Sequence, residues 1–560
     1  MSRFRRPVKR RLDGAARYGR FRSPLAALGL VIALAPIETA RAQAAPDSKK
    51  PSTALLAKTT GPDLELFRNR VLETLRATNS DRGSWGMLIV DRDTGATLYE
   101  MNADHFFIPA SNAKLFTTAV ALATLGPDYR FRTTLESEAT LASDGRLAGD
   151  LILVGRGDPD LSNRKMPYAG MPEREGVTEK VLAEMADQLV AEGLKEVDGD
   201  IVSDDRYFPY DPYPAAWTVG DLYFRFGAPV SAIAFNDNTV SIDILPGERI
   251  GGRATVRTEP GAAGESFGYD IATGPREIEP DLAVVRQPGQ KFVLLRGTVP
   301  LAHQAVRLDL AMIEPAETAG LALRQVLEAR GVQVTGGTEV RHAPPPETSA
   351  SGEPILTHNG QPEPESTQHV LVEHVSLPLL EAVRITNKVS QNLHAELLLR
   401  SVGRIKLGVG STAAGLKVER SFLHQVGIVD GDVVLTDGSG LARDDLVTPR
   451  AVVALLEYVG GQPWGADYIS TLPVAGVDGT LQNRMVHSAA SNRIQAKTGE
   501  VEHERGLSGY ATTLGGEHLV FSIFYNNNPQ KGPESSAPID QIATAMIETL
   551  GTDRPLPKRP

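Results

Sequence analysis

The chain contains no cysteine among its 560 residues. A disulfide framework, a zinc finger, an iron–sulfur cluster and thiol catalysis are therefore excluded. Three familiar signatures are also missing: H-E-x-x-H of zinc peptidases, the dinucleotide-binding G-x-G-x-x-G and the Walker loop. The eleven histidines are scattered without the spacing of a metal site, so we predict neither a metal ion nor a cofactor.

Negative charge exceeds positive charge in the chain as a whole but not at its N-terminus. The first 22 residues hold nine Lys or Arg against one acid, Asp13, which is a charge of +8. Because the formal net charge of the whole chain is −11, the remainder carries −19. A body of this charge repels phosphate backbones, so we predict no nucleic-acid partner.

Long hydrophobic runs are absent apart from one short run, 24–36, directly after the basic N-terminus. The segment Ala40-Arg-Ala42-Gln-Ala44 follows and offers an A-x-A cleavage site. These features are typical of a secretory signal peptide. We therefore predict a signal peptide at 1–42, cleavage after Ala42 or Ala44, a periplasmic protein and at most a peripheral contact with the membrane. An uncleaved anchor is the alternative, although the run is short for a bilayer.

The composition and the hydrophobic patterning of the sequence change along the chain. Residues 62–132 together with 369–550 are predicted to form one discontinuous catalytic domain. Residues 133–342 alternate short strands with Gly, Pro and Asp turns, which predicts a β-rich insertion of two subdomains. Three further segments complete the division: a flexible lead-in at 43–61, a Pro/Ser/Glu-rich linker or loop at 343–368 and a tail at 551–560.

Hydrophobic spacing predicts helices and strands at both ends of the chain. The predicted helices are Asp63–Arg76, Ala110–Leu125, Thr178–Glu192, Ala316–Ala329, Leu379–Thr386, Leu393–Val402 and Pro538–Leu550. The predicted strands are a hairpin within Trp85–Tyr99, then Thr133–Ala139, Asp150–Val154, Asp198–Val202, Val240–Ile244, Phe292–Gly297, Arg493–Lys497, Leu507–Thr513 and Leu519–Tyr525. We therefore predict an α/β (α+β) fold, with an antiparallel sheet flanked by helices and built from both termini around the insertion.

Ser111 and Lys114 lie near the start of the predicted helix Ala110–Leu125. Residues three apart on a helix share a face, so the lysine can reach the hydroxyl, and the free N–H groups of the first turn favour a developing oxyanion. To act as a base, Lys114 needs its pKa lowered from about 10.4 toward 7 by burial and a nearby cation. Alternatively, Ser111 is a helix cap and Lys114 a solvated side chain, because S-x-x-K occurs by chance about once in such a chain.

Two later tripeptides complement this pair. Ser390-Gln-Asn392 lies between two predicted helices, and by itself it is an ordinary helix cap. Lys497-Thr-Gly499 ends a predicted strand, and by itself it is a lysine that guards a sheet edge. Together and in this order, the three motifs supply a nucleophile, a base, a hydroxyl relay, an amide and a second cation.

With these motifs the chain resembles the penicillin-recognising serine DD-peptidases and β-lactamases. Within that group it is similar to the class C low-molecular-mass penicillin-binding proteins, the D-Ala-D-Ala carboxypeptidase/endopeptidases of the penicillin-binding protein 4 type. The cue is that Ser390 follows Lys114 by 276 positions, where this family carries a large insertion. Further matching segments are 109–115, 155–159, 204–208 with Trp217, 387–392, 437–441 and 507–510. The resemblance covers roughly residues 62–550 and implies a penicillin-binding/β-lactamase-like transpeptidase domain.

The resemblance implies five catalytic residues. Ser111 attacks the D-Ala-D-Ala carbonyl of a peptidoglycan stem peptide and becomes acylated, while Lys114 takes its proton. Ser390 relays a proton to the leaving amine, and Asn392 holds the peptide amide of the substrate. Lys497 supports the field that lowers the pKa of Lys114. β-Lactam antibiotics are implied as covalent inhibitors of the same serine.

The same resemblance implies the substrate-binding residues. Thr498 binds the terminal carboxylate of the substrate, and Gly499 lies beside it in the same motif. The backbone N–H groups of Ser111 and Glu500 form the oxyanion hole.

Two positions depart from the family pattern. Gln391 stands where aspartate is common, but it touches none of the implied roles. Glu500 stands where a small hydroxyl residue is common, and its negative charge would lie near an anionic ligand. We therefore expect weaker binding of a free terminal carboxylate, unless Glu500 points away toward Arg505.

Two other functions compete with a DD-peptidase. A β-lactamase needs an efficient deacylating water, and no clear device for one is present in the sequence. A catalytically weak peptidoglycan-binding protein does not need all five catalytic residues, whereas all five are intact here.

Overall fold

The computed structural model describes residues 61–551, apart from 79, 172, 262–265, 288–289, 302–303 and 346–367. The predicted signal peptide and cleavage site lie outside the described residues, as do nearly all of the predicted lead-in, linker and tail. Within the described ranges, no helix is both long and apolar enough to cross a membrane.

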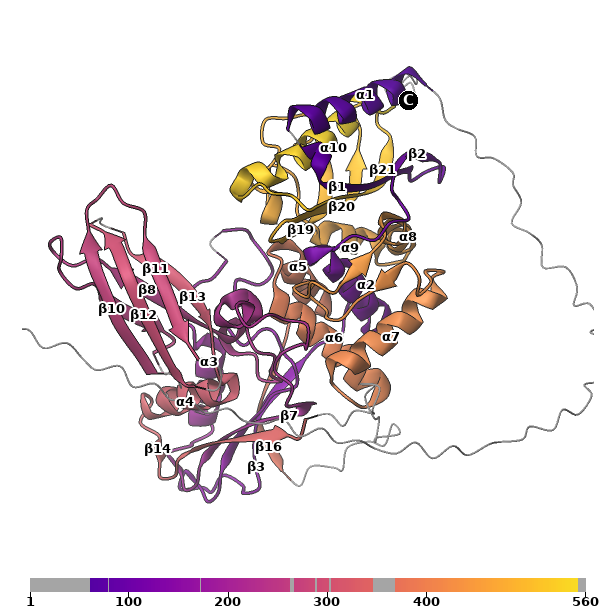
Figure 1. Ribbon diagram of the computed structural model, residues 1–560. Coiled ribbons are helices and arrows are strands. Elements are labelled where there is room, and N and C mark those ends of the chain that lie inside the picture. Colours follow the sequence, from indigo (N-terminus) through magenta and orange to yellow (C-terminus); the bar gives the residue numbers. More distant parts are fainter. Residues whose placement is uncertain are drawn as a thin grey trace, which may run out of the picture. The chain divides into compact units, whose positions relative to one another are not determined.

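A five-stranded antiparallel sheet joins the two ends of the described chain. Its strands, in spatial order, are β19 (Ile494–Val501), β20 (Glu504–Thr512), β21 (His518–Asn526), β1 (Ser84–Asp91) and β2 (Thr97–Met101). In Figure 1 the indigo strand β1 lies beside the yellow strand β21. Trp85 pairs with Tyr525 across this junction, and their rings stack with centroids 4.3 Å apart.

Helices cover both faces of this sheet. Helices α1 (Pro62–Ala77) and α10 (Ala537–Thr549) pack together and share one apolar core with Met87 and Ile89 of β1. Helices α2 (Ala113–Leu125) and α8 (Pro449–Gly460) share a second core with Leu88 and Val90. Because alternate residues of β1 enter two different cores, the strand is a continuous apolar run in the sequence.

Four more helices stand on the side of α2: α5 (Leu379–Lys388), α6 (Asn392–Leu407), α7 (Thr412–Gln425) and α9 (Gly465–Thr471). A two-stranded ribbon, β17 (Val433–Val434) with β18 (Leu446–Val447), lies in the same part of the chain. Helices α6 and α7 approach closely, since a Cβ on Gly415 would lie 2.3 Å from the carbonyl oxygen of Leu399. Helices α7, α8 and α9 were not predicted from the sequence.

The inserted region has its own apolar core, formed by helices α3 (Lys180–Ala191) and α4 (Pro315–Glu328) and by several sheets. Its largest sheet has the order β15 (Thr338–Ala343), β7 (Ile201–Pro209), β5 (Leu151–Val154), β3 (Arg132–Ser137) and β16 (His369–Val375). Three smaller sheets are β14 (Gln333–Val334)–β6 (Glu196–Val197)–β4 (Arg146–Leu147), β13 (Val306–Ala311)–β8 (Thr239–Leu245)–β9 (Thr255–Glu259) and β10 (Ser266–Gly274)–β12 (Phe292–Pro300)–β11 (Asp281–Arg286). The predicted α/β (α+β) architecture with a β-rich insertion is confirmed, and its division into two subdomains remains a prediction.

One predicted strand boundary is corrected by the structure. The domain boundary at 369 remains a prediction, and strand β16, which begins there, pairs with β3, with His374 opposite Thr133. The strand predicted at Asp198–Val202 begins later, as β7, because Asp198 and Gly199 form a bend. A Cβ on Gly199 would lie 2.6 Å from the backbone of Gly149, so this bend needs the absence of a side chain.

Candidate active site

Ser111 lies in a single 3₁₀ turn, η2 (Ala110–Asn112), that leads directly into helix α2. Ser111 is partly exposed, whereas Lys114, one turn later, has no exposed surface. Helix α2 is rich in Ala, Leu and Val, and every residue from Ala113 to Leu122 is buried. The helix thus leaves the hydroxyl accessible while it removes the lysine from water.

The amine of Lys114 has three hydrogen-bond acceptors around it. Its Nζ atom lies 2.8 Å from Oγ of Ser111, 2.7 Å from Oδ1 of Asn392 and 2.5 Å from the carbonyl oxygen of Ser439. The contact with Ser111 is the one that their helical spacing predicts. The contact with Asn392 brings together two of the predicted motifs.

Burial lowers the pKa of Lys114 to about 7, against the attraction of Asp437, Glu396 and Asp445 for its proton. Burial and the charge of Lys114 lower the pKa of Lys497 well below its usual value. Burial is the largest cause of the lowered pKa of Lys114, and the contribution of Lys497 to it, which the resemblance implies, remains a prediction.

Ser390 lies in the turn between α5 and α6 with a φ of 60°, which is uncommon for a residue other than glycine. Its hydroxyl accepts a hydrogen bond from Nζ of Lys497 at 2.8 Å. The next residue, Gln391, caps α6 because its side-chain oxygen accepts from the N–H of Leu393 at 3.1 Å. The unusual Gln391 thus has a capping role and leaves Ser390 in contact with Lys497.

Asn392, the first residue of α6, links the site to the inserted region. Its Oδ1 atom accepts from Lys114, and its Nδ2 atom donates to the carbonyl oxygen of Phe226 at 2.8 Å. The partner at Phe226 is a backbone atom, so no side-chain pattern in the sequence could have indicated it.

Lys497 and Thr498 are presented by β19, an edge strand of the sheet. Besides Ser390, Lys497 donates to the carbonyl oxygen of Thr498 at 2.8 Å. The hydroxyl of Thr498 donates to the hydroxyl of Thr480 at 2.8 Å. Thr480 was missed in the sequence, where nothing marks it apart from other threonines.

Gly499 allows β19 to lie directly against the turn that carries Ser111. A Cβ at Gly499 would lie 2.5 Å from the carbonyl oxygen of Pro109 and 2.5 Å from the amide nitrogen of Asn112. Any side chain here would push the strand away from the turn that carries Ser111. The positions of the two proposed oxyanion-hole N–H groups, on Ser111 and Glu500, therefore depend on this glycine.

Glu500 pairs with Arg505 across the β19–β20 ladder. One carboxylate oxygen of Glu500 lies 3.0 Å from the guanidinium of Arg505. The Arg505 side chain is only 7% exposed, so the cation is held in place by its surroundings. The Glu500 side chain is 64% exposed and lies over this cation from the solvent side. The sequence left open whether Glu500 points toward Arg505, and in the structure it does.

A buried acidic group stands behind Lys114 and was missed as such in the sequence. It comprises Asp437, Glu396, Glu419 and Asp445. Burial raises the pKa of Glu396 and of Glu419 to about 8, and burial and Asp437 raise that of Asp445 well above its usual value. The segment 437–441 was noticed only as a match to a family, without a role for its aspartate.

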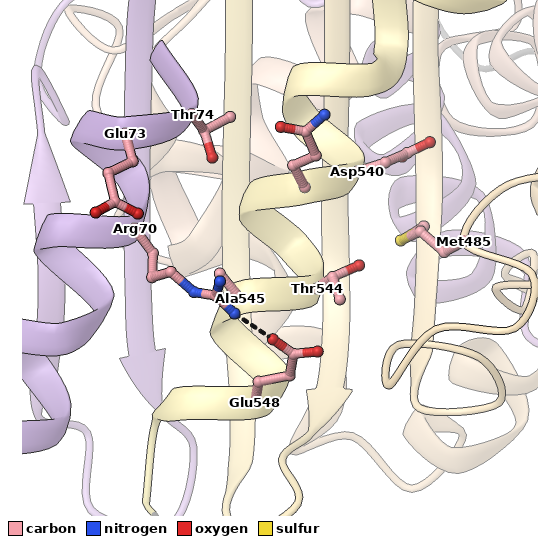
Figure 2. Close-up of a pocket in the computed structure, with 9 residues that line it drawn as sticks. Arg70, Glu73, Thr74, Met485, Asp540, Thr544, Ala545 and Glu548 are labelled. Atoms are coloured by element: carbon pink, nitrogen blue, oxygen red, sulfur yellow. Dashed lines mark hydrogen bonds and ion pairs between the residues drawn. The ribbon is translucent and has the colours of Figure 1, made fainter. Parts of the chain in front are cut away.

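No group of three or more His, Asp or Glu side chains among the described residues is arranged to hold a metal ion. A surface hollow of about 390 Å³ lies between α1 and α10, where the Arg70–Glu548 ion pair crosses it at 2.6 Å (Figure 2). None of the residues that line it belongs to the three motifs.

A serine beside a buried, neutralisable lysine, with a second serine bound to a lysine on an edge strand, is the arrangement of the penicillin-recognising serine hydrolases. The chain belongs to the D-Ala-D-Ala carboxypeptidase 3 (S13) family, whose model matches residues 69–546. The predicted enzyme class, a serine D-Ala-D-Ala carboxypeptidase or endopeptidase and hence a hydrolase, is confirmed by this membership.

Individual relatives of the chain have names of the same enzyme class. The chain is 32% identical to the D-alanyl-D-alanine carboxypeptidase of an Actinomadura species over 519 residues, which cover 89% of this chain and 88% of the relative. It is 25% identical over 494 residues to the D-alanyl-D-alanine carboxypeptidase DacB of Haemophilus influenzae, covering 87% and 95% of the two chains. The crystal structure of penicillin binding protein 4 from Haemophilus influenzae superposes with a TM-score of 0.71 at 23% identity, covering 85% and 98%. This similarity confirms the predicted penicillin-binding/β-lactamase-like fold.

Proposed function

We propose that the protein hydrolyses the D-Ala-D-Ala end of peptidoglycan stem peptides through an acyl-enzyme on Ser111, and that β-lactams acylate the same serine. One observation carries the proposal: the partly exposed hydroxyl of Ser111 lies 2.8 Å from a buried amine, Lys114, whose pKa is lowered to about 7. An amine of this pKa is uncharged in a large fraction of molecules at neutral pH, so it can accept the serine proton.

The surroundings of Lys114 orient this proton transfer. An uncharged amine has two N–H bonds, which donate to Asn392 and to the carbonyl of Ser439, and its lone pair then faces the hydroxyl of Ser111. As Lys114 takes the proton, Oγ of Ser111 bonds to the carbonyl carbon of the substrate. The backbone N–H groups of Ser111 and Glu500 stabilise the resulting oxyanion.

Collapse of the tetrahedral intermediate breaks the C–N bond to the terminal D-alanine. The hydroxyl of Ser390 gives its proton to the departing amine and recovers one from Lys497, to which it is hydrogen-bonded at 2.8 Å. Lys497 in turn recovers a proton from Lys114, which had taken it from Ser111. If the departing amine belongs to a cross-linked stem peptide instead of free D-alanine, the identical steps constitute endopeptidase activity.

Substrate binding uses groups that retain spare hydrogen-bonding capacity. The amide nitrogen of Asn392 has two N–H bonds, and only one is taken by the carbonyl of Phe226, so the other can hold the substrate peptide carbonyl. The hydroxyls of Thr498 and Thr480 form a pair that can turn toward a terminal carboxylate. Gly499 keeps this strand close to the nucleophile.

Hydrolysis of the acyl-enzyme reverses the first step with water in place of the amine. Lys114, having lost its proton to the relay, takes one from the water while the water oxygen bonds to the acyl carbon. The ester bond to Ser111 then breaks, and Oγ recovers a proton. With a β-lactam the departing nitrogen stays tethered to the acyl group by the opened ring, which blocks the approach of water.

The N-terminal sequence supports the place of action. A basic segment, an apolar run at 24–36 and the A-x-A site before Ala42 or Ala44 favour export to the periplasm with a cleaved signal peptide. Peptidoglycan lies in that compartment, so the proposed location and the proposed substrate agree.

Labelling with a fluorescent penicillin tests the function. Purified protein and the Ser111→Ala variant are incubated with the label, with Ser421→Ala as a matched control, because Ser421 is a helix-surface serine whose hydroxyl donates to the backbone of its own helix. Stable labelling of the wild type and of the control, with none of Ser111→Ala, supports the proposal. Rapid loss of the label indicates a β-lactamase, and an unlabelled wild type indicates a peptidoglycan-binding protein without catalysis.

A further inference from the structure

The loop 437–442, between β17 and β18, is organised around one carboxylate. Five of the six hydrogen bonds that Asp437 accepts come from the loop itself: N–H groups of Ser439, Gly440, Leu441 and Ala442, and the hydroxyl of Ser439, at 2.6–3.1 Å. A carboxylate accepts without donating, so it suits a ring of donors, and an amide does not. Asp437 is fully buried, so no solvent competes for these bonds.

This loop contacts Lys114 on one side and, on the other, the residue that precedes Ser111. The carbonyl of Ser439 accepts from Lys114 at 2.5 Å, and the carbonyl of Gly438 accepts from Thr117 on the same helix at 2.7 Å. On the other side, Gly440 has a φ of 74°, and a Cβ there would lie 1.9 Å from the carbonyl oxygen of Ala110. The loop therefore lies against the residue before Ser111 and against the amine after it.

The sixth donor to Asp437 comes from the inserted region. The indole N–H of Trp217, in the segment between β7 and β8, donates to Oδ2 of Asp437 at 2.7 Å, and both residues are buried. The same segment supplies the carbonyl of Phe226 that binds Asn392. One stretch of the insertion thus binds Asn392 directly and reaches Ser439 through Asp437.

The charges around Lys114 single out Asp437. Glu396 on α6, Asp445 near β18 and Asp437 attract the proton of Lys114, and Lys497 on β19 faces it as the other buried amine. Burial raises the pKa of Glu396 to about 8, and burial together with Asp437 raises the pKa of Asp445 well above its usual value. Asp437 differs from both in its contacts, since six donors converge on its carboxylate.

We propose that Asp437 is a positioning residue for acylation, and that Trp217 of the inserted region secures it. Asp437 holds the carbonyl of Ser439 in place, and that carbonyl directs the lone pair of Lys114 at Ser111. The inserted region is therefore part of the catalytic apparatus. The inference rests on the proposed roles of Ser111 and Lys114.

The first test is the pH dependence of acylation by a fluorescent penicillin in Asp437→Asn, expressed per titrated active site. The plateau rate is expected to fall about tenfold or more, because the amide cannot satisfy the ring of donors. The acidic limb of the profile is expected to move to lower pH, because a negative charge that favours protonated Lys114 is gone. A merely structural role would lower the number of active sites without moving this limb.

The second test replaces only the indole donor. Trp217→Phe keeps the apolar ring and the charge of Asp437, so the plateau rate is expected to fall several-fold while the acidic limb stays in place. Trp85→Phe is the matched control, since Trp85 is also buried and its indole donates to the carbonyl of Ser80 at 2.8 Å. Trp85 lies in the core that α1 and α10 share. Its acylation rate is expected to equal that of the wild type.

The outcomes separate this inference from the proposed function. If wild-type protein is not labelled at Ser111, the proposed function itself fails. If the wild type is labelled and Asp437→Asn matches it in rate and in pH profile, the role of Asp437 is overturned. If Trp217→Phe and Trp85→Phe acylate equally fast, the contribution of the inserted region is overturned. Thermal unfolding of each variant shows that the rates belong to folded protein.

Discussion

The amine of Lys114 lies 2.8 Å from the hydroxyl of Ser111, and burial brings its pKa down to about 7. The base must be uncharged to take the serine proton, so acylation is expected to rise with pH through about 7 and then to level off. The measurement is the second-order acylation rate with a β-lactam that does not itself titrate between about pH 5 and pH 9. A rate that is level across this range, in protein that stays folded, would contradict the role of Lys114 as base.

The Glu500–Arg505 ion pair predicts how the site tolerates an anion beside a carboxylate-bearing ligand. Arg505→Gln frees the charge of Glu500, so KM for such a ligand is expected to rise roughly threefold to tenfold. In the double variant with Glu500→Thr the repelling charge is absent, and KM is expected to return toward the wild-type value.

Glu500→Thr alone serves as the control for this cycle. Since Arg505 already holds Glu500, the single change is expected to alter KM little. A large gain of affinity in Glu500→Thr would mean that the ion pair does not neutralise the carboxylate. Equal KM values for Arg505→Gln and the double variant would mean that Arg505 acts through its other hydrogen bonds, to Ser535 and to the backbone.

Gly440 and Gly427 form a matched pair for testing close approach. Both have positive φ, at 74° and 86°, but a Cβ at Gly440 meets the Ala110 carbonyl, whereas one at Gly427 meets nothing within 4 Å. Each change to alanine is expected to cost about 1 kcal/mol of stability for its backbone conformation. Only Gly440→Ala is also expected to slow acylation about tenfold or more, because it displaces the turn before Ser111. Equal acylation rates in the two variants would contradict a role for the close approach of Gly440 to Ala110.

Buried Glu419 on α7 predicts a pH-dependent stability. Its pKa is raised from 4.5 in the unfolded chain to about 8, because burial disfavours the charged form. Below about 4.5 its contribution to stability is fully present, and it is lost as the pH rises toward 8, since the unfolded state has already released its proton. Glu419→Gln stays neutral, so relative to the wild type it is expected to gain roughly 2–4 kcal/mol between pH 5 and pH 8.

Urea unfolding at the two pH values measures this difference. Glu73→Gln is the control, because Glu73 lies exposed on α1 and its replacement should leave the pH dependence unchanged. A wild type and a Glu419→Gln variant whose stabilities change in parallel with pH would show that Glu419 is ionised in the folded protein.

Periodicity predicted the outer elements of the fold well. The predicted helices Asp63–Arg76 and Pro538–Leu550 correspond to α1 and α10 within about a residue at each end, because each buries one clear apolar stripe. Helix α7 was missed because its buried face includes Thr412, Gly415 and Glu419, which carry no hydrophobic signal. Helix α8 had a usable signal, since Thr448 caps it and Pro449 is its first residue.

The contacts of the candidate site were also predictable only in part. The Ser111–Lys114 contact follows from helical spacing, and motif order brought in Ser390, Asn392 and Lys497. The acceptors at Ser439 and Phe226 are backbone carbonyls, whose positions depend on loops and leave no trace in side-chain type. Burial of Lys114 depends on three dimensions of packing, so the physical reason for its lowered pKa was accessible only with the structure.

The sheet that joins the two ends of the described chain determines when the active site can assemble during folding. Strand β1 and Ser111 leave the ribosome early, but β19 with Lys497 and the strand β21 that pairs with β1 come near the end. The turn around Ile108 is tied to Asn526, 418 positions later. Pairing over such separations forms slowly, and none of it forms before the last strands exist. A chain in which β21 has not yet paired with β1 thus carries Ser111 without its partners, and hydrolytic activity is expected only after this pairing.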